Sequence, residues 1–405
     1  MALLPGPAAS PRAAGAGGAL HVPSFDVPRQ LTVLPAPDSP DAVLGTVLPA
    51  VRAALDGTAP LAVLPSGPAA AAARAVLAPG EPLEDGVDLV VVTSGSTGGG
   101  RGVLLPASAL ATSATATADR LGGPGAWLLT LPVSAIAGLQ VLVRSVLAGT
   151  VPTAPAPGED LAAAVARMPA GRRYTAMVPT QLRRYLGSET AALRAFDAVL
   201  VGGAATDPAL LARARETGVA AVTTYGMTET AGGCVYDGVP LDGVRVRVTG
   251  DGIVVGGPVL ALGYRRDPEG TATAFAGGEF RTRDAGSLGP DGFLTVLGRL
   301  DDVVVTGGVN VAPQVVEGAL REHPAVADAV VFGRPDDEWG QRVVAAVVPA
   351  PGAAPDLAAL RPWVAERLGG PSAPRELHLI GSVPTLHTGK PDRRGVAARL
   401  VGGAR

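Results

Sequence analysis

Lysine is almost absent from this chain. The 405 residues include 33 lysine and arginine residues, and Lys390 is the only lysine among them. Both side chains carry one positive charge, but lysine presents a compact point charge and arginine a wide planar fork. A site that must place one small cation between two reacting anions can therefore require lysine. An exposed lysine left near the C-terminus by a biased composition is the competing interpretation.

A loop rich in glycine and hydroxyl side chains follows an apolar stretch at residues 87–92. It reads Thr-Ser-Gly-Ser-Thr-Gly-Gly-Gly-Arg-Gly over residues 93–102. Glycines let backbone N–H groups converge on an anion, and hydroxyls add further donors, so this loop predicts phosphate binding. The Gly-Lys-Ser/Thr ending of a kinase-type P-loop is missing. The alternative is a flexible linker, which rarely follows a fully apolar strand.

The composition favours a large folded protein and excludes several classes of function. Apolar residues make up 47% and charged residues 17%, which supports a large core and argues against disorder. The net charge of −3 and a pI of about 5.9 give no electrostatic footprint for nucleic acid. Cys234 is the only cysteine, so an internal disulfide is excluded and a reducing cytoplasm is expected. Residues 1–5 do not resemble a signal peptide, and the interrupted apolar stretch 126–143 argues against a membrane span.

Apolar runs alternate with helical patterns, which is typical of layered α/β folds. The chain is long enough for two domains. We expect an N-terminal domain, residues 1–299, of layered and largely parallel α/β sheets with a small antiparallel β region near residues 242–255. Within it we expect strands at 87–92, 126–131, 175–178 and 198–201 and helices at 136–147 and 179–186. We expect a small mobile α+β domain at residues 300–405, with strands at 303–305, 325–332 and 342–348 and helices from 313 and at 357–368.

Five segments together resemble the signatures of the adenylate-forming acyl-CoA synthetase superfamily. The loop at 93–102 is similar to its Thr-Ser-Gly-Ser-Thr-Gly-x-Pro-Lys-Gly motif, and residues 225–230 to its Tyr-Gly-x-Thr-Glu motif. Residues 280–284 are similar to its Tyr-x-Thr-Gly-Asp motif, and residues 298–308 to its inter-domain hinge. Lys390 falls where the family has its catalytic lysine. The segments occur in the family's order, which makes chance agreement negligible.

The resemblance implies an ATP-dependent ligase that works in two steps. A carboxylate attacks the α-phosphate of ATP to give an acyl-adenylate and pyrophosphate, and a thiol, usually that of coenzyme A, then attacks the acyl-adenylate. Lys390 would stabilise the charge that develops between the two anions. Thr228 would donate to the α-phosphate, and Glu229 would be a ligand of Mg²⁺, a hard cation that bridges phosphates.

The resemblance also implies which residues bind the nucleotide and the thiol. Tyr225 offers a flat face for adenine, and Asp284 can accept from the ribose hydroxyls. Asp301 matches the hinge, and Gly307 and Gly308 would line the thiol tunnel. The full ATP- and AMP-binding set is Thr93, Ser94, Gly95, Ser96, Thr97, Gly98, Arg101, Gly202, Gly203, Ala204, Tyr225, Gly226, Asp284 and Arg299.

The chain departs from the family's patterns at three places in the expected site. Arg101 follows Gly100 where the phosphate loop usually has Pro-Lys, and an arginine can still reach terminal phosphates. Ala135 stands where the family often has a histidine, so that contact to the acid must be absent or supplied elsewhere. Arg283 replaces the glycine beside Asp284.

The chain is about one hundred residues shorter than typical superfamily members, with the deficit at the N-terminus. This length and the segments 121–129, 225–240 and 296–299 resemble those of superfamily members that activate o-succinylbenzoate in menaquinone biosynthesis. One carboxylate of this aromatic di-acid is activated, and the other needs a cationic partner. Arg144 lies in the otherwise apolar helix expected at 136–147, where the family has its arginine for the distal carboxylate. Ser134, Met227 and Thr230 complete the expected acid-binding set. Alternatively, Arg144 reaches the surface or pairs with an aspartate.

We therefore expect ATP-dependent activation of o-succinylbenzoate, followed by transfer to coenzyme A, in the cytoplasm. Nucleic acid is not an expected partner, and a homodimer remains open. The alternatives are a ligase for another aryl or acyl acid, a stand-alone adenylation enzyme that loads a carrier protein, and a non-catalytic adenine-nucleotide binder. Lys390 and Glu229 argue against the last alternative.

Overall fold

Two sheets in the N-terminal part of the chain enclose a layer of helices. The computed structural model describes residues 29–93, 100–384 and 392–402. The first sheet has the order β1 (Thr32–Leu34), β2 (Leu61–Val63), β3 (Leu89–Thr93), β4 (Arg101–Leu105) and β13 (Gly263–Tyr264). The second has the order β10 (Val239–Pro240), β9 (Gly232–Tyr236), β8 (Ala221–Met227), β7 (Ala198–Val201), β6 (Arg173–Met177) and β5 (Ala126–Leu128).

Central strands such as β3 and β7 are buried on two faces, which explains their nearly continuous apolar sequences. Successive side chains of a strand point to opposite faces. Leu89 and Val91 of β3 therefore join the central core, whereas Val90 joins the core on the outer face of the first sheet. In β7, Leu200 belongs to the central core and Val199 to the core on the outer face of the second sheet.

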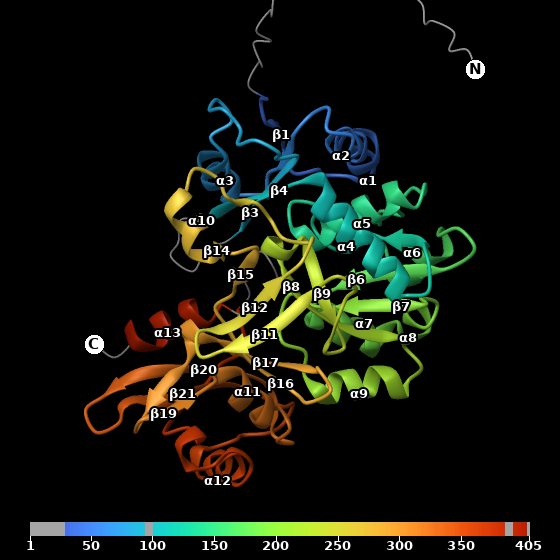
Figure 1. Ribbon diagram of the computed structural model, residues 1–405. Helices are drawn as coiled ribbons and strands as arrows, with labels where there is room; N and C mark the ends of the chain where they lie inside the picture. Colours follow the sequence, from blue (N-terminus) through green and yellow to red (C-terminus); the bar gives the residue numbers. More distant parts are fainter. Residues whose placement is uncertain (1–28, 94–99, 385–391, 403–405) are drawn as a thin grey trace, which may run out of the picture.

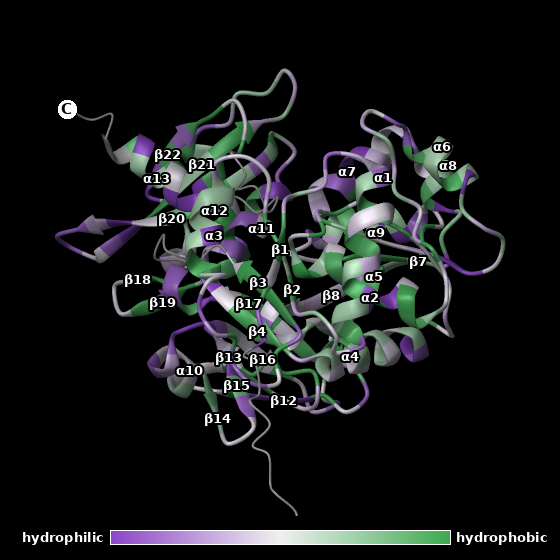
Figure 2. Cartoon of the chain, turned by 90° about the horizontal axis from the view of Figure 1, so that it is seen from above, coloured by the Kyte–Doolittle hydropathy of each residue, from purple (hydrophilic) through white to green (hydrophobic). Residues whose placement is uncertain are grey.

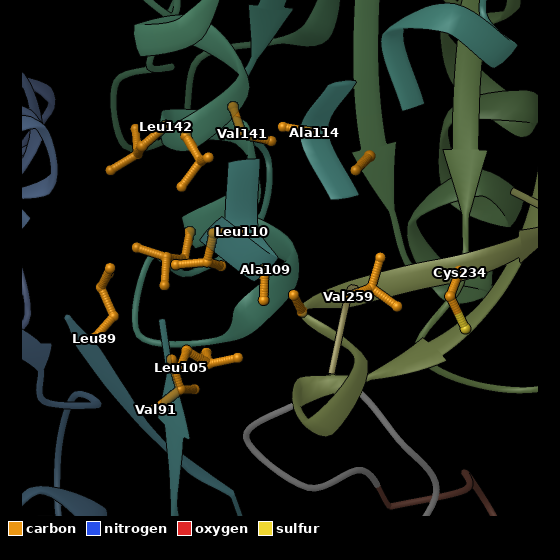
Figure 3. Packing of buried hydrophobic residues seen from close by; sticks show 14 of the residues in the cluster. Leu89, Val91, Leu105, Ala109, Leu110, Ala114, Val141, Leu142, Cys234 and Val259 are labelled. Atoms are coloured by element: carbon orange, nitrogen blue, oxygen red, sulfur yellow. The ribbon is translucent and has the colours of Figure 1, made fainter. Parts of the chain in front are cut away.

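Helices fill the space between these two sheets and cover the outer face of each sheet (Figure 1). Figure 3 shows side chains of the first sheet meeting those of α4 and α5 in the central layer, and Figure 2 shows the hydrophobic residues gathered in the interior. The central layer contains α2 (Leu48–Leu55), α4 (Ala107–Arg120) and α5 (Ile136–Leu147). The outer layers contain α3 (Ala69–Leu77) over the first sheet, and α6 (Leu161–Ala166), α7 (Pro179–Ser188), α8 (Thr190–Leu193) and α9 (Pro208–Glu216) over the second. The short helix α1 (Pro40–Ala42) and a π-helical turn at Val43–Val47 precede α2.

An antiparallel region follows the two layered sheets. Its sheet has the order β11 (Arg245–Thr249), β12 (Gly252–Gly256), β15 (Glu279–Arg281) and β14 (Phe275–Ala276), with α10 (Pro268–Ala274) before β14. The hairpin of β16 (Asp284–Leu288) and β17 (Leu294–Arg299) comes next. Its register places Asp284 directly opposite Arg299.

The C-terminal part has hydrophobic cores of its own, formed by residues between Val304 and Val396. The buried residues of the N-terminal cores end at Leu294. The domain boundary expected at residues 299 and 300 falls between these cores and stays a prediction. The C-terminal strands are β18 (Val304–Thr306), β19 (Val309–Val311), β20 (Val326–Asp336), β21 (Gly340–Pro349) and β22 (Glu376–Leu379), and its helices are α11 (Pro313–Arg321), α12 (Leu357–Leu368) and α13 (Arg393–Gly402).

Most expected elements are present, and one feature differs. The helices expected at 136–147 and 357–368 have those bounds as α5 and α12. Residues 69–77 form the helix α3. The sheets are mixed, because β4 runs antiparallel to β3 and β9 runs antiparallel to β8. In the part of the chain that the structure describes, no helix has the length and apolar character needed to cross a membrane.

Arg265, the residue after β13, connects the first sheet to the end of its outer helix α3 and to the loop that follows α3. Its side chain is fully buried. The guanidinium donates to carbonyl groups at the end of α3 and in the following loop, and to one carboxylate, which satisfies its forked set of donors. The acceptors are the carbonyl oxygens of Leu77, Ala78, Glu81 and Pro82 at 2.6–3.0 Å and Oε2 of Glu84 at 2.6 Å.

We predict that Arg265→Ala strongly destabilises the N-terminal part of the protein. The substitution leaves a carboxylate and several carbonyl groups without their buried partner, and breaking such a pair costs about 3 kcal/mol or more. Urea unfolding followed by tryptophan fluorescence checks the expected shift of the midpoint. Arg247→Ala is the control, because it removes an exposed pair with Glu279 and should leave the midpoint nearly unchanged. Equal midpoints for the two variants would contradict the role of Arg265.

Candidate active site

A rigid turn follows the end of β8 and presents Thr228 and Glu229. The hydroxyl of Thr230 accepts from the Met227 N–H at 3.0 Å and donates to the Gly232 carbonyl at 2.7 Å. Thr230 is fully buried, so its hydroxyl serves the turn. The expectation that Thr230 also contacts the acid stays a prediction. The turn ends at Ala231, which adopts a left-handed backbone conformation.

Glycine is needed where β8 and β9 cross at this turn. A Cβ atom on Gly226 would lie 2.1 Å from the carbonyl oxygen of Gly232. A Cβ atom on Gly202, in the loop after β7, would lie 2.2 Å from Oγ1 of Thr224. The loop of Gly202, Gly203 and Ala204 therefore lies against the strand that carries Tyr225, which brings together two segments assigned to adenine.

Glu229 lies beside Tyr264, which sequence reasoning missed. The Tyr264 hydroxyl donates to Oε1 of Glu229 at 3.1 Å, and the Arg101 guanidinium lies over the Tyr264 ring, 4.7 Å from its centre. Burial raises the pKa of the Glu229 carboxyl and the pKa of the Tyr264 hydroxyl. Arg101 and Tyr264 line a cavity of about 280 Å³ together with Arg266 and Asp267.

Asp284 receives two donors that hold its carboxylate in place. The Tyr225 hydroxyl donates to Oδ2 at 2.8 Å, and Nη1 of Arg299 donates to Oδ1 at 3.2 Å. Burial and the nearby charge of Asp284 raise the pKa of Tyr225, so this phenol remains a donor. Each carboxylate oxygen keeps a further lone pair, so Asp284 can still accept from a diol.

Arg144 is buried in the central helix layer and pairs with no carboxylate among the described residues. Its guanidinium lies over the Trp127 ring, 4.7 Å from the centre, and Nη2 donates to the hydroxyls of Tyr236 at 3.3 Å and Thr117 at 3.4 Å. Its Nε finds no hydrogen-bond partner within the described ranges. Burial lowers the pKa of this guanidinium. Neither alternative for Arg144, a surface position or an aspartate partner, is observed.

Gln140 lies one turn before Arg144 on α5. Its Nε2 donates to the Ala231 carbonyl at 2.6 Å, which ties α5 to the turn of Thr228 and Glu229. Among the other acid-binding candidates, Ser134 is half-buried just before α5, and Met227 is half-buried at the end of β8. No spacing in the sequence signals Gln140, Tyr236 or Trp127 as neighbours of this site.

Two expected parts of the site lie wholly or partly outside the described residues. Outside the described residues lie Lys390 and the phosphate-loop residues Ser94, Gly95, Ser96, Thr97 and Gly98, whose expected roles stay predictions. Thr93 and Arg101 flank the loop, and the ladder of β3 and β4 pairs them directly. Arg101 therefore emerges at the base of the loop, next to Tyr264.

The residues expected to form the hinge lie between the two sets of cores. Asp301 accepts from Arg283, and its Oδ2 lies 3.5 Å from Nη2 of Arg299, whereas Asp302 accepts from Arg393 at 2.8 Å. Adjacent aspartates are thus bound to opposite parts of the chain. Gly307 and Gly308 form the turn between β18 and β19, where a Cβ atom on Gly307 would lie 2.8 Å from the Trp339 ring.

Comparison with known proteins identifies the family. Residues 39–264 match the AMP-binding enzyme family, and residues 315–390 match the AMP-binding enzyme C-terminal domain. A probable 2-succinylbenzoate–CoA ligase of Mycobacterium tuberculosis is 48% identical over 370 residues, covering 88% of this chain and 96% of that protein. A 2-succinylbenzoate–CoA ligase of Geobacillus kaustophilus is 34% identical, covering 74% of this chain and 66% of that protein.

Solved structures have the same mixed α/β architecture with a small C-terminal unit, as expected. The amide bond synthetase of Marinactinospora thermotolerans has a TM-score of 0.73 at 27% identity and covers 91% of this chain and 89% of its own. The o-succinylbenzoate CoA synthetase of Bacillus subtilis, in complex with its acyl-adenylate intermediate, has a TM-score of 0.72 at 25% identity and covers 90% of this chain and 82% of its own. The chain described here therefore belongs to the AMP-binding enzyme family.

Proposed function

We propose that this chain activates 2-succinylbenzoate, also called o-succinylbenzoate, with ATP and transfers the acyl group to coenzyme A. The names of the relatives in Mycobacterium tuberculosis and Geobacillus kaustophilus support this substrate, and the high coverage of the first supports it over most of the chain. The observation in the structure that carries the proposal is the buried guanidinium of Arg144, which pairs with no carboxylate of the described residues.

Arg144 is suited to the second carboxylate of a di-acid. A buried charge is costly unless a partner of opposite charge or several hydrogen bonds compensate it. Two hydroxyls and an aromatic face compensate Arg144 only in part, and its Nε is free of protein partners in the described ranges. A carboxylate bound at this guanidinium would supply the missing charge. In an acid with one carboxylate, the only anionic group would react with ATP. Arg144 would then have no carboxylate partner.

In the first step, a carboxylate oxygen of the acid forms a bond to the α-phosphorus of ATP, and the bond from that phosphorus to the bridging β-oxygen breaks. Pyrophosphate leaves with the electron pair. Thr228 can donate to the α-phosphate, Arg101 to the terminal phosphates, and Lys390 would stabilise the charge between the reacting groups. In the second step, the coenzyme A thiolate attacks the acyl carbon, and AMP leaves.

The residues present fit a Mg²⁺ ion that is held mainly by phosphates. The described residues contain no cluster of three acidic, histidine or cysteine side chains that could form a protein cage. Mg²⁺ usually binds one or two carboxylates together with phosphates and waters. Glu229 supplies one such carboxylate, and burial raises its pKa. When bound, Mg²⁺ would neutralise charge on the phosphates.

The pivot between the N-terminal unit, 1–299, and the C-terminal unit, 300–405, lies in this proposal at Asp301. Asp301 is bound to Arg283 and Arg299 of the N-terminal unit, whereas Asp302 is bound to Arg393 of the C-terminal unit. A rotation between the steps can therefore occur about the backbone dihedrals φ and ψ of Asp301 without breaking the Asp302 contact. Gly307 and Gly308 would then face the thiol. The cytoplasmic location and a homodimer also remain proposals.

The role of Arg144 predicts how Arg144→Ala affects different acids. Losing one partner of a desolvated charged hydrogen bond costs roughly 2–5 kcal/mol, so kcat/KM for 2-succinylbenzoate should fall by about thirty-fold or more. An analogue without the second carboxylate should lose far less, and KM for ATP should change little. Steady-state kinetics of pyrophosphate release with both acids gives the comparison. Equal losses for both acids would mean that Arg144 is structural. Arg184→Ala is the control, because Arg184 stacks on Tyr185 at the surface.

The role of Lys390 predicts that Lys390→Ala blocks one half-reaction. Loss of a preorganised charge contact costs on the order of 100-fold or more in kcat, so acyl-adenylate formation should fall by at least that factor. Thioester formation from supplied acyl-adenylate should remain near that of the wild type. Rapid-quench measurements of the two half-reactions check this, and near-normal adenylation would reject the assignment. CoA-dependent thioester formation by the wild type also separates the ligase from an enzyme that loads a carrier protein.

The role of Asp301 predicts that Asp301→Pro traps one orientation of the C-terminal unit. Proline fixes one backbone dihedral, so one half-reaction should survive and the other should fail. Asp301→Ala is the matched control, because it removes the contact with Arg283 but leaves the dihedral free. Both half-reactions should persist in that variant. A loss of both half-reactions to the same extent in folded Asp301→Pro would reject the pivot.

A further inference from the structure

Tyr264 is held rigidly although its strand β13 has only two residues. The side chain is buried, and its ring packs edge to face on Phe275, with 5.5 Å between the ring centres. Its backbone N–H donates to Oγ1 of Thr271 at 2.9 Å. The next residue, Arg265, is anchored by the buried contacts described above. The position of the Tyr264 hydroxyl is therefore set by the surrounding fold.

The segment before Tyr264 also holds the backbone of Glu229. The Ala261 N–H donates to the Glu229 carbonyl at 2.9 Å, and the Tyr264 hydroxyl donates to Oε1 of the same residue at 3.1 Å. Glu229 is thus held at both its main chain and its side chain by residues of one short segment. Donation to Oε1 orients the carboxylate and leaves Oε2 free of this contact.

Arg101 lies on the face of the same ring. Its guanidinium is 4.7 Å from the centre of the Tyr264 ring, and its Nε is 4.0 Å from Oδ2 of Asp267. Half of the Arg101 side chain is exposed, on the side where the cavity of about 280 Å³ opens. The ring attracts the cation through its π face. Arg101 therefore has a preferred position that still leaves donors free for a ligand.

The Tyr264 side chain contacts two opposite charges. Arg101 and Glu229 form no direct ion pair, and Tyr264 contacts the carboxylate through its hydroxyl and the guanidinium through its ring. A direct pair would neutralise the two groups that the proposed reaction needs separately, one for terminal phosphates and one for Mg²⁺. Tyr264 can thus present a cation and a carboxylate to the same phosphate chain.

We infer that Tyr264 is a positioning residue for the Mg²⁺–ATP complex, which it aligns by orienting Glu229 through its hydroxyl and Arg101 through its ring. The inference rests on the proposed function, since it assigns the phosphates to Arg101 and the metal to Glu229. It adds a residue outside the motifs that the sequence resemblance covers.

Two substitutions separate the hydroxyl from the ring. Tyr264→Phe removes the contact with Glu229 and keeps the stacking of Arg101. A lost hydrogen bond to a charged group should weaken MgATP binding by about tenfold. Tyr264→Leu also releases Arg101 and allows it to pair with Glu229, so binding should weaken by about a hundredfold. KM for the acid should stay within about twofold in both variants.

Isothermal titration calorimetry with ATP measures the effect without relying on turnover. Titrations with Mg²⁺ and with EDTA should show that Tyr264→Phe loses more ATP affinity when Mg²⁺ is present. Adding Tyr264→Phe to the Glu229→Gln variant should cause little further loss of ATP affinity, since both changes act on one carboxylate. Tyr185→Phe is the matched control, because Tyr185 also has a stacked arginine and a hydrogen-bonded hydroxyl but lies on the exposed helix α7.

The outcomes distinguish this inference from the proposed function. If the wild type binds no MgATP, the proposed function fails. If the wild type binds MgATP and Tyr264→Phe binds it equally well, the inference fails and the proposed function stands. Three results would show that Tyr264 is merely structural and would overturn the inference. They are equal losses of affinity for ATP and for the acid, equal losses of ATP affinity with and without Mg²⁺, and losses of ATP affinity that add to those of Glu229→Gln.

Discussion

The enclosure of α5 between two sheets is the constraint on which the candidate site depends. A helix surrounded on all sides must be apolar, and most of α5 is. Its two long polar side chains, Gln140 and Arg144, cannot reach water and must find partners in neighbouring elements. Gln140 finds the Ala231 carbonyl, and Arg144 finds Tyr236, Thr117 and the face of Trp127. The same helix therefore contacts the turn of Thr228 and Glu229 and holds the cation proposed for the acid.

A second chain of contacts joins the residues proposed for the nucleotide to the proposed hinge. Tyr225 and Arg299 both donate to Asp284, and Arg299 also approaches Asp301, where Arg283 adds a further contact. A ligand that competes for Asp284 would therefore act on residues that also touch the hinge. Arg283, which departs from the family's usual glycine, adds an ion pair that a glycine could not form.

The scarcity of lysine is consistent with the several hydrogen bonds that single arginine side chains donate in this structure. Arg265 satisfies four carbonyls and a carboxylate at once. Arg393 joins the Val331 carbonyl, Glu317 and Asp302 within the C-terminal unit. Both residues use several donors in fixed directions, which a lysine ammonium cannot reproduce. The one retained lysine stands where the proposed chemistry needs a compact charge.

The sequence by itself determined the family, the order of the motifs and the bounds of strongly periodic elements such as α5 and α12. These features are local, because a motif or an amphipathic period is readable within a few residues. Only the tertiary structure decided which side chains meet. Tyr264 reaches Glu229 across 35 residues, and Tyr236 reaches Arg144 across 92. No spacing encodes such contacts, since they arise when β13 pairs with the distant strand β4 and when α5 packs against β9. For the same reason, the sequence predicted that Arg144 needs a partner but could not show that the described protein supplies hydroxyls and an aromatic face instead of a carboxylate.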